Sequence, residues 1–147
     1  MDLIKSVLVV CIGNICRSPV GERVLQIALP DMIVTSAGLG ALVGYSADAV
    51  ANAVAKKHGI NLEGHEAQQF TSALGVKQDL ILVMEPGHRL EIGRIAPQLL
   101  GKTMLFDHWV GGKGIADPYR ASHEFHELTF KKIEAAGIAW AKQLKKD

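Results

Sequence analysis

The sequence predicts a single α/β domain over residues 1–147, in which a doubly wound, four-stranded parallel sheet has helices on both faces. Three observations predict it. Short β-branched apolar runs alternate with segments of helical spacing, no repeat, linker or low-complexity segment interrupts them, and 48% of the residues are apolar. Strands that alternate with helices form parallel sheets through right-handed crossovers. A chain of this length and composition buries one ordinary core.

The first expected elements are a strand over 7–10 and a helix over 19–29. The strand is a β-branched apolar run, and the helix carries Val20 and Val24 on one side at helical spacing. A second strand is expected over 32–35. The glycine-rich stretch SAGLGALVGYS follows as a connection to the next helix.

That next helix is expected over 46–58, with Ser46 as its N-cap and Gly59 as its stop. The run LILV then marks the clearest buried strand, over 79–84. Proline is favoured in the first helical turn, so a third helix is expected to open at Pro86 and to run towards residue 97.

A fourth, shorter strand is expected over 103–106. The last helix is expected to begin at about Tyr119 or Ser122, and its apolar residues recur at spacings of three and four. This core-facing stripe consists of Phe130, Ile133, Gly137, Trp140 and Leu144.

The composition excludes several classes of function. Sixteen basic and fifteen acidic residues are scattered along the chain and leave a net charge of +1, whereas nucleic-acid binding needs clustered Lys and Arg. No apolar stretch reaches 18 residues, and the first residues lead directly into a strand pattern and not into a signal peptide. We therefore expect a cytoplasmic protein that neither binds nucleic acid nor inserts into a membrane. Separately, we expect a monomer.

The only two cysteines, Cys11 and Cys16, lie five positions apart just after the first expected strand. They would make a poor structural disulfide in a reducing compartment, so we interpret them as reactive thiols. Ligands of doubly wound sheets bind beyond the carboxyl ends of the strands, where Cys11 is expected. The five residues between Cys11 and Arg17 can curl so that their N–H groups form a nest for an oxyanion, with the positive end of a helix facing it.

These residues suit attack of sulfur on phosphorus. The positive surroundings of Cys11 favour its thiolate, which is the nucleophilic form. Arg17 can hold two phosphate oxygens at once. Gly13 and Asn14 suit the tight backbone geometry that turns N–H groups inward. Ser18 can donate its hydroxyl hydrogen to the thiolate and later to the departing sulfur.

A phosphomonoester also needs a proton for its departing oxygen, and Asp117, at the carboxyl side of the sheet, can supply it. An ordinary turn residue is the alternative interpretation of Asp117, because Asp-Pro is common in turns. His123 and His126 are three positions apart on the last helix, but no third metal ligand accompanies them. We expect a solvated helix face there, and neither a metal nor a cofactor.

Together these motifs resemble the low-molecular-weight protein tyrosine phosphatases. The match is to V-C-x-G-N-x-C-R-S-P over 10–19 and to D-P-Y over 117–119, and chain length and element order agree over the whole chain. The resemblance implies a protein-tyrosine phosphatase in which Cys11 forms a phosphocysteine, Arg17 clamps the phosphate and Asp117 acts as general acid and later activates water. The remaining implied loop residues are Ile12, Gly13, Asn14, Ile15, Cys16 and Ser18.

The resemblance further implies a supporting network of Asn14, Ser36 and His65, and a pocket wall that includes Tyr119. Leu42 stands at the rim where many eukaryotic members carry an aromatic residue. Arg120 replaces a second tyrosine, and Gln68 replaces an arginine common in the family. The core chemistry is untouched, whereas substrate choice is left open.

Several stretches look most like bacterial members that pair with tyrosine autokinases controlling capsule or exopolysaccharide export, so a phosphotyrosine protein of that kind is the expected partner. Two alternatives stay open. Arsenate reductases share this fold and loop but need a further cysteine pair, which this chain lacks. A phosphate-binding module without catalysis is the other.

The sequence also suggests why two cysteines share one loop. Peroxide oxidises a reactive thiolate to a sulfenic acid, which a neighbouring thiol can capture before further, irreversible oxidation. Cys16 is the only other thiol, and a tight loop could bring the two Cα atoms within the roughly 4.4–6.8 Å that a disulfide tolerates. We therefore expect Cys16 to be the redox partner of Cys11.

Overall fold

A computed structural model describes residues 3–145 of the chain. Its centre is a sheet of four parallel strands, as the sequence predicts, and their order is β2-β1-β3-β4. The strands are β1 (Ser6–Cys11), β2 (Ile33–Gly38), β3 (Leu80–Val83) and β4 (Thr103–Leu105).

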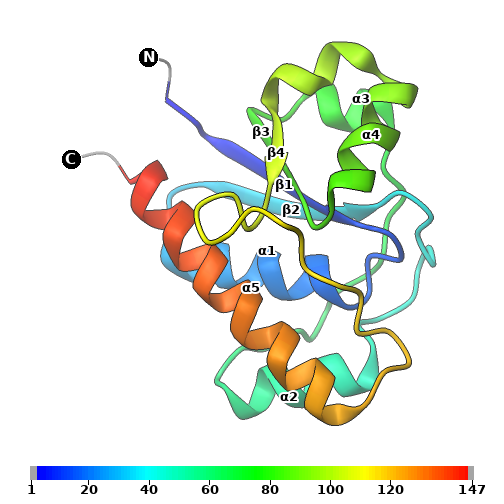
Figure 1. The fold of residues 1–147 in the computed structure, drawn as a ribbon, viewed down its shortest axis with the longest axis vertical. Coiled ribbons are helices and arrows are strands. Elements are labelled where there is room, and N and C mark those ends of the chain that lie inside the picture. The colour runs from blue at the N-terminus through cyan, green and yellow to red at the C-terminus, as the bar shows by residue number, and fades with distance from the viewer. Residues whose placement is uncertain (1–2, 146–147) are drawn as a thin grey trace.

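Helices cover both faces of this sheet (Figure 1). One face carries α1 (Arg17–Ala28), α2 (Ala49–Lys57) and the long α5 (His123–Leu144), which runs along α1. The other face carries α3 (Ser72–Val76), α4 (Pro86–Ile95) and the 3₁₀ helix η1 (Pro97–Lys102). The doubly wound arrangement is thereby confirmed.

The central strand β1 is buried on both faces, which explains its continuous apolar sequence. Side chains alternate along a strand, so Val7 and Val9 join the core beneath α1 and α5. Leu8 and Val10 join the second core beneath α4 and η1. A polar residue at any of these positions would be buried on one face or the other.

Two of the differences between predicted and observed boundaries have a clear physical reason. The helix expected from residue 46 begins at Ala49, because the carboxylate of Asp48 accepts from the N–H groups of Val50 and Ala51 and caps the helix in place of Ser46. The stretch taken as a connection after residue 35 continues β2 to Gly38, which pairs with the last residue of β1.

Two short elements, α3 and η1, were missed because five or six residues give too little periodicity to recognise. The start of α5 follows the second of the two expected alternatives, since the Ser122 hydroxyl caps it by accepting from Phe125 N–H at 3.1 Å. The helix α1 begins two residues earlier than predicted, at Arg17. In the described residues, no helix is long and apolar enough to cross a membrane.

The strand order places a switch point at the carboxyl end of β1. The chain continues from β1 to β2 on one side of it and later returns to β3 on the other side. The connections that follow the neighbouring strands β1 and β3 lead to α1 and α4 on opposite faces of the sheet, which opens a crevice at this point. Cys11 is the last residue of β1 and lies there.

Candidate active site

The loop between β1 and α1, residues 12–16, turns its carbonyl groups away from the crevice. The carbonyl oxygens of residues 11, 12, 13 and 15 accept from the N–H groups of Leu39, Gly40, Leu42 and Asp48 at 2.9–3.1 Å. The fifth, the oxygen of Asn14, accepts from Nε2 of His65 at 2.5 Å. Within residues 3–145, no protein acceptor takes the N–H groups of 12–16, which are left to face an anion.

This backbone path needs special residues at two positions. Asn14 adopts a left-handed φ of 60°, which asparagine tolerates better than most residues. Gly38 packs against the loop so closely that a Cβ there would lie 2.2 Å from the carbonyl oxygen of Ile12. The end of β2 therefore shapes the anion nest.

A chain of hydrogen bonds supports the loop from below. The amide Nδ2 of Asn14 donates to Ser18 Oγ at 2.7 Å and to Ser36 Oγ at 3.0 Å. Ser18 Oγ lies 2.9 Å from the Cys11 sulfur. A thiolate carries no hydrogen, so the Ser18 hydroxyl must donate to it.

Sequence reasoning missed two members of this network. Ser36 Oγ donates to the carboxylate of Glu22, and the N–H of Gln68 donates to Asn14 Oδ1 at 2.9 Å. The amide of Gln68 also donates to the carbonyl of Ser36 at 2.8 Å, so this departure from the family pattern still ties β2 to the loop. The position of Glu22, five residues after Arg17 on an inward face of α1, was the only available signal.

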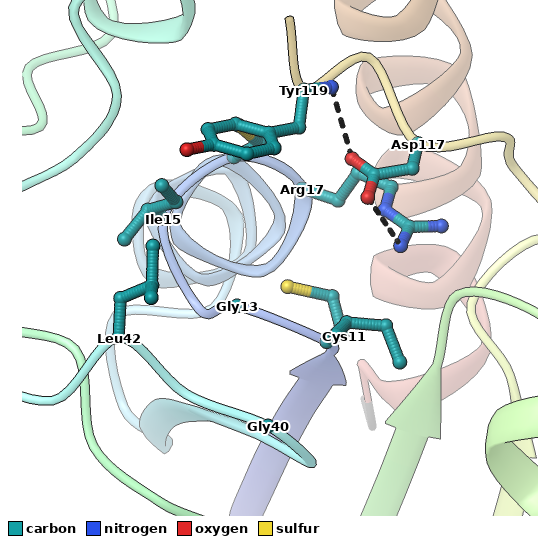
Figure 2. Close-up of a pocket in the computed structure, with 10 residues that line it drawn as sticks. Cys11, Gly13, Ile15, Arg17, Gly40, Leu42, Asp117 and Tyr119 are labelled. Atoms are coloured by element: carbon teal, nitrogen blue, oxygen red, sulfur yellow. Dashed lines mark hydrogen bonds and ion pairs between the residues drawn. The ribbon is translucent and has the colours of Figure 1, made fainter.

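The guanidinium of Arg17 is 1% exposed and lies beside Cys11 (Figure 2). Its Nη1 donates to the carbonyl of Ile115 at 2.7 Å and forms an ion pair with Glu85. Its Nη2 lies 3.6 Å from a carboxylate oxygen of Asp117. Its buried Nε has no partner in the described part of the chain, so the edge made by Nε and Nη2 is available to a phosphate.

Asp117 stands over the same crevice on the segment between β4 and α5. Its Oδ1 accepts from the N–H of Tyr119 at 3.0 Å, while Oδ2 faces Arg17. The side chain is 44% exposed, so water and a leaving group can both reach it. The turn therefore uses one oxygen of the carboxylate and leaves the other beside Arg17.

Together these groups line a pocket of about 190 Å³ (Figure 2). The sulfur of Cys11 lies at its base, and Leu42, Ile15 and Tyr119 form an apolar wall above it. The guanidinium of Arg120 lies 5.1 Å from the centre of the Tyr119 ring, so this replacement supports the wall by a cation–π contact. The remaining lining residues are Ile12, Gly13, Cys16, Arg17, Gly40 and Asp117.

The surroundings of the second cysteine differ from those of the first. Cys16 is 5% exposed, and burial raises the pKa of its thiol, with the charges of Asp48 and Asp117 acting in the same direction. Both cysteines are free thiols.

The expectation of a solvated face for His123 and His126 was wrong for one of them. His123 is exposed, whereas His126 is 4% exposed, lines a small cavity together with Pro118, and has its Nε2 4.0 Å from Oδ2 of Asp48. No group of three metal-ligating side chains occurs among residues 3–145.

Comparison with known proteins matches residues 6–147 to the family described as low molecular weight phosphotyrosine protein phosphatase. The chain belongs to this family. It is 51% identical over 142 residues to the probable low molecular weight protein-tyrosine-phosphatase AmsI of Erwinia amylovora, covering 97% of this chain and 99% of that one. The predicted family and enzyme class, a protein-tyrosine phosphatase, are confirmed.

Solved structures of known proteins have the same fold. The tyrosine phosphatase Wzb from Escherichia coli K30 in complex with sulphate has a TM-score of 0.96 and 50% identity, covering 97% of this chain and all of that one. A more distant structure, the arginine phosphatase YwlE from Geobacillus stearothermophilus, has a TM-score of 0.89 and 31% identity, covering 95% and 92%.

Proposed function

We propose that this phosphatase hydrolyses phosphotyrosine in proteins through a phosphocysteine intermediate. One observation carries the proposal: Cys11 lines a pocket together with loop residues whose N–H groups have no acceptor among residues 3–145, and with Arg17, whose buried Nε has no partner there either. A buried guanidinium without a partner at Nε is costly unless an anion occupies the pocket.

In the first step the thiolate of Cys11 attacks phosphorus, an S–P bond forms, and the bond from phosphorus to the tyrosine oxygen breaks. The departing phenolate takes the proton of Asp117. The N–H groups of the loop and Arg17 stabilise the charge on the three equatorial oxygens, and their positions are fixed before substrate arrives.

In the second step a water molecule gives its proton to the carboxylate of Asp117 and attacks phosphorus. The S–P bond breaks, and the departing thiolate is stabilised by a hydrogen bond from the Ser18 hydroxyl, whose oxygen lies 2.9 Å away. Inorganic phosphate leaves and Asp117 is again protonated. The reaction consumes only the substrate and water, and the enzyme is regenerated.

The pocket wall supports an aryl phosphate as the substrate. Leu42, Ile15 and Tyr119 offer apolar surface to a ring. The identity of 50% to a tyrosine phosphatase, against 31% to an arginine phosphatase, supports the same choice. Arsenate reduction would need a further cysteine pair, and this chain has none, since its only two cysteines lie in one loop.

The decisive experiment compares peptides that carry phosphotyrosine, phosphoserine or phosphoarginine, together with arsenate supplied with thioredoxin. Release of phosphate from the phosphotyrosine peptide alone is expected. The variant Cys11→Ser should lose turnover but still bind phosphate, because the backbone nest and Arg17 are retained. Activity above about one hundredth of the parent would contradict covalent catalysis by this sulfur.

We further propose that the substrate is a bacterial tyrosine autokinase of capsule or exopolysaccharide export, and that the phosphatase acts as a cytoplasmic monomer. The stretches GKTMLFDHW and DPYRAS support the pathway, since they resemble members that pair with such kinases. Co-expression with a neighbouring tyrosine kinase should lower phosphotyrosine on that kinase, and the Cys11→Ser variant should not lower it. Sedimentation of the purified protein measures its oligomeric state.

A further inference from the structure

His88 is a buried titratable side chain that the mechanism above does not use. It lies in the first turn of α4 and is 5% exposed. Its Nδ1 lies 3.2 Å from the backbone N of Glu85, the N-cap of that helix. A backbone N–H only donates, so Nδ1 must accept, and the proton of the neutral ring is on Nε2.

The other ring nitrogen faces the Glu85 side chain. Nε2 lies 3.5 Å from Oε2 of Glu85, the same oxygen that pairs with Nη1 of Arg17. His88 thus contacts Glu85 twice, once at its backbone and once at its carboxylate. Glu85 is 40% exposed, so solvent alone would not fix the direction of its carboxylate.

The direction of that carboxylate matters for the phosphate clamp. Glu85 and the carbonyl of Ile115 together occupy Nη1 of Arg17. With Nη1 occupied, the guanidinium presents Nε and Nη2 to a ligand. A carboxylate free to rotate could compete with phosphate for that same edge.

We propose that His88 is a positioning residue for the phosphate clamp: it holds the Glu85 carboxylate on Nη1 of Arg17 and so reserves the Nε–Nη2 edge for phosphate. This inference rests on the proposed function, because the clamp has a role only if phosphate is bound. In an ordinary capping box this position carries Glu or Gln, whose side chain accepts from the N-cap N–H in the same way.

The charge state of His88 fits this role. Three charged groups face the ring: Arg17, Glu85 and Asp117. Burial and then the charge of Arg17 lower the pKa of His88 to about 4, against the opposing effect of the two carboxylates. The ring is therefore neutral at ordinary working pH and keeps Nδ1 as an acceptor.

The test measures the dissociation constant for inorganic phosphate at pH 6 in the full chain and in His88→Leu. We expect His88→Leu to bind phosphate about 3- to 10-fold more weakly, the equivalent of about one lost hydrogen bond, and to raise KM more than it lowers kcat. His88→Gln should restore most of the affinity, because its amide oxygen can accept from the N–H of Glu85.

Two controls separate positioning from a general loss of stability. Ile92→Val removes one methylene from the fully buried apolar face of the same helix and should lower Tm while leaving phosphate affinity within about twofold of the parent. In a Glu85→Gln background, His88→Leu should weaken phosphate binding no further, since the group through which it acts is altered.

Unchanged phosphate affinity in folded His88→Leu, or a full additional loss in the Glu85→Gln background, would overturn the inference. If His88→Leu fails to fold, nitrogen NMR of the ring in the parent decides: an unprotonated Nδ1 supports the assignment, and a protonated Nδ1 overturns it. Failure of the parent itself to bind phosphate would instead overturn the proposed function.

Discussion

Replacing Asp117 with asparagine isolates the proton that the leaving group needs. Asn keeps an Oδ1 that can accept from the N–H of Tyr119, which in the parent lies 3.0 Å from the carboxylate, so the turn over the pocket is retained. What is lost is the acid itself and a charge 3.6 Å from Nη2 of Arg17. A positioned general acid contributes about 10²- to 10⁴-fold, so kcat should fall by that factor.

Comparing two leaving groups distinguishes loss of the acid from distortion of the pocket. p-Nitrophenolate can depart without a proton, whereas phenolate needs one. Asp117→Asn should therefore slow the hydrolysis of phenyl phosphate much more than that of p-nitrophenyl phosphate. Steady-state rates on both substrates are the assay. The matched control is Asp79→Asn, the same substitution at the opposite end of the sheet, where the carboxylate accepts from the N–H of Lys5 at 2.8 Å. Equal losses on both substrates would refute the acid role and move it to another carboxyl group, with Glu85 the nearest candidate.

Three further predictions concern redox chemistry, loop shape and pH. Mild peroxide should inactivate the enzyme by oxidising Cys11 to a sulfenic acid that Cys16 converts to a disulfide with loss of water; mass spectrometry should show one loop peptide lighter by two hydrogens, and dithiothreitol should restore activity. Because burial raises the pKa of Cys16, that second step should speed up as pH rises. Gly38→Ala should abolish phosphate binding, because the new Cβ would lie 2.2 Å from a loop carbonyl; Gly101→Ala, with open space around it, should bind normally. In the folded protein the pKa of His88 is about 4, which is below its value in the unfolded chain. The free energy of unfolding should therefore fall by at most about 3 kcal/mol as pH drops from about 6.5 to about 4. In urea titrations, His88→Gln should flatten this pH dependence.

Each of these three can fail in a distinct way. Full thiol-dependent recovery in Cys16→Ser would leave that residue a packing residue only. A Gly38→Ala protein that binds phosphate normally would mean that the loop does not need its observed path. An equally steep pH dependence of unfolding in His88→Gln would assign acid sensitivity to other groups.

The sequence was informative where chemistry and periodicity coincide. The strand ending at Cys11 and the loop up to Arg17 could be predicted because an apolar run, a turn and a helix start follow one another within about a dozen residues. The acid role of Asp117 was only one of two interpretations until a family motif supported it, because nothing in its neighbourhood shows that it lies close to Arg17.

The partners that act over long separations could not be read from the chain. Glu85 pairs with Arg17 across 68 positions, and no motif in the sequence indicates that contact. Asp48 displaced Ser46 as a helix cap because its backbone N–H is held by the loop carbonyl of residue 15. Such contacts depend on how the crossovers bring distant segments together, and the local propensities of residues do not determine that arrangement.

The bond from Arg17 to the carbonyl of Ile115 has a consequence for synthesis on the ribosome. It joins residues 98 positions apart, and the segment that bears Ile115 is followed by α5, which packs along α1. A nascent chain that stops before this segment contains the whole cysteine loop but lacks the acceptor for Nη1 and the acid at Asp117. Arg17 therefore gains its carbonyl acceptor and its neighbouring carboxylate only late in translation, and we expect incomplete chains to be inactive.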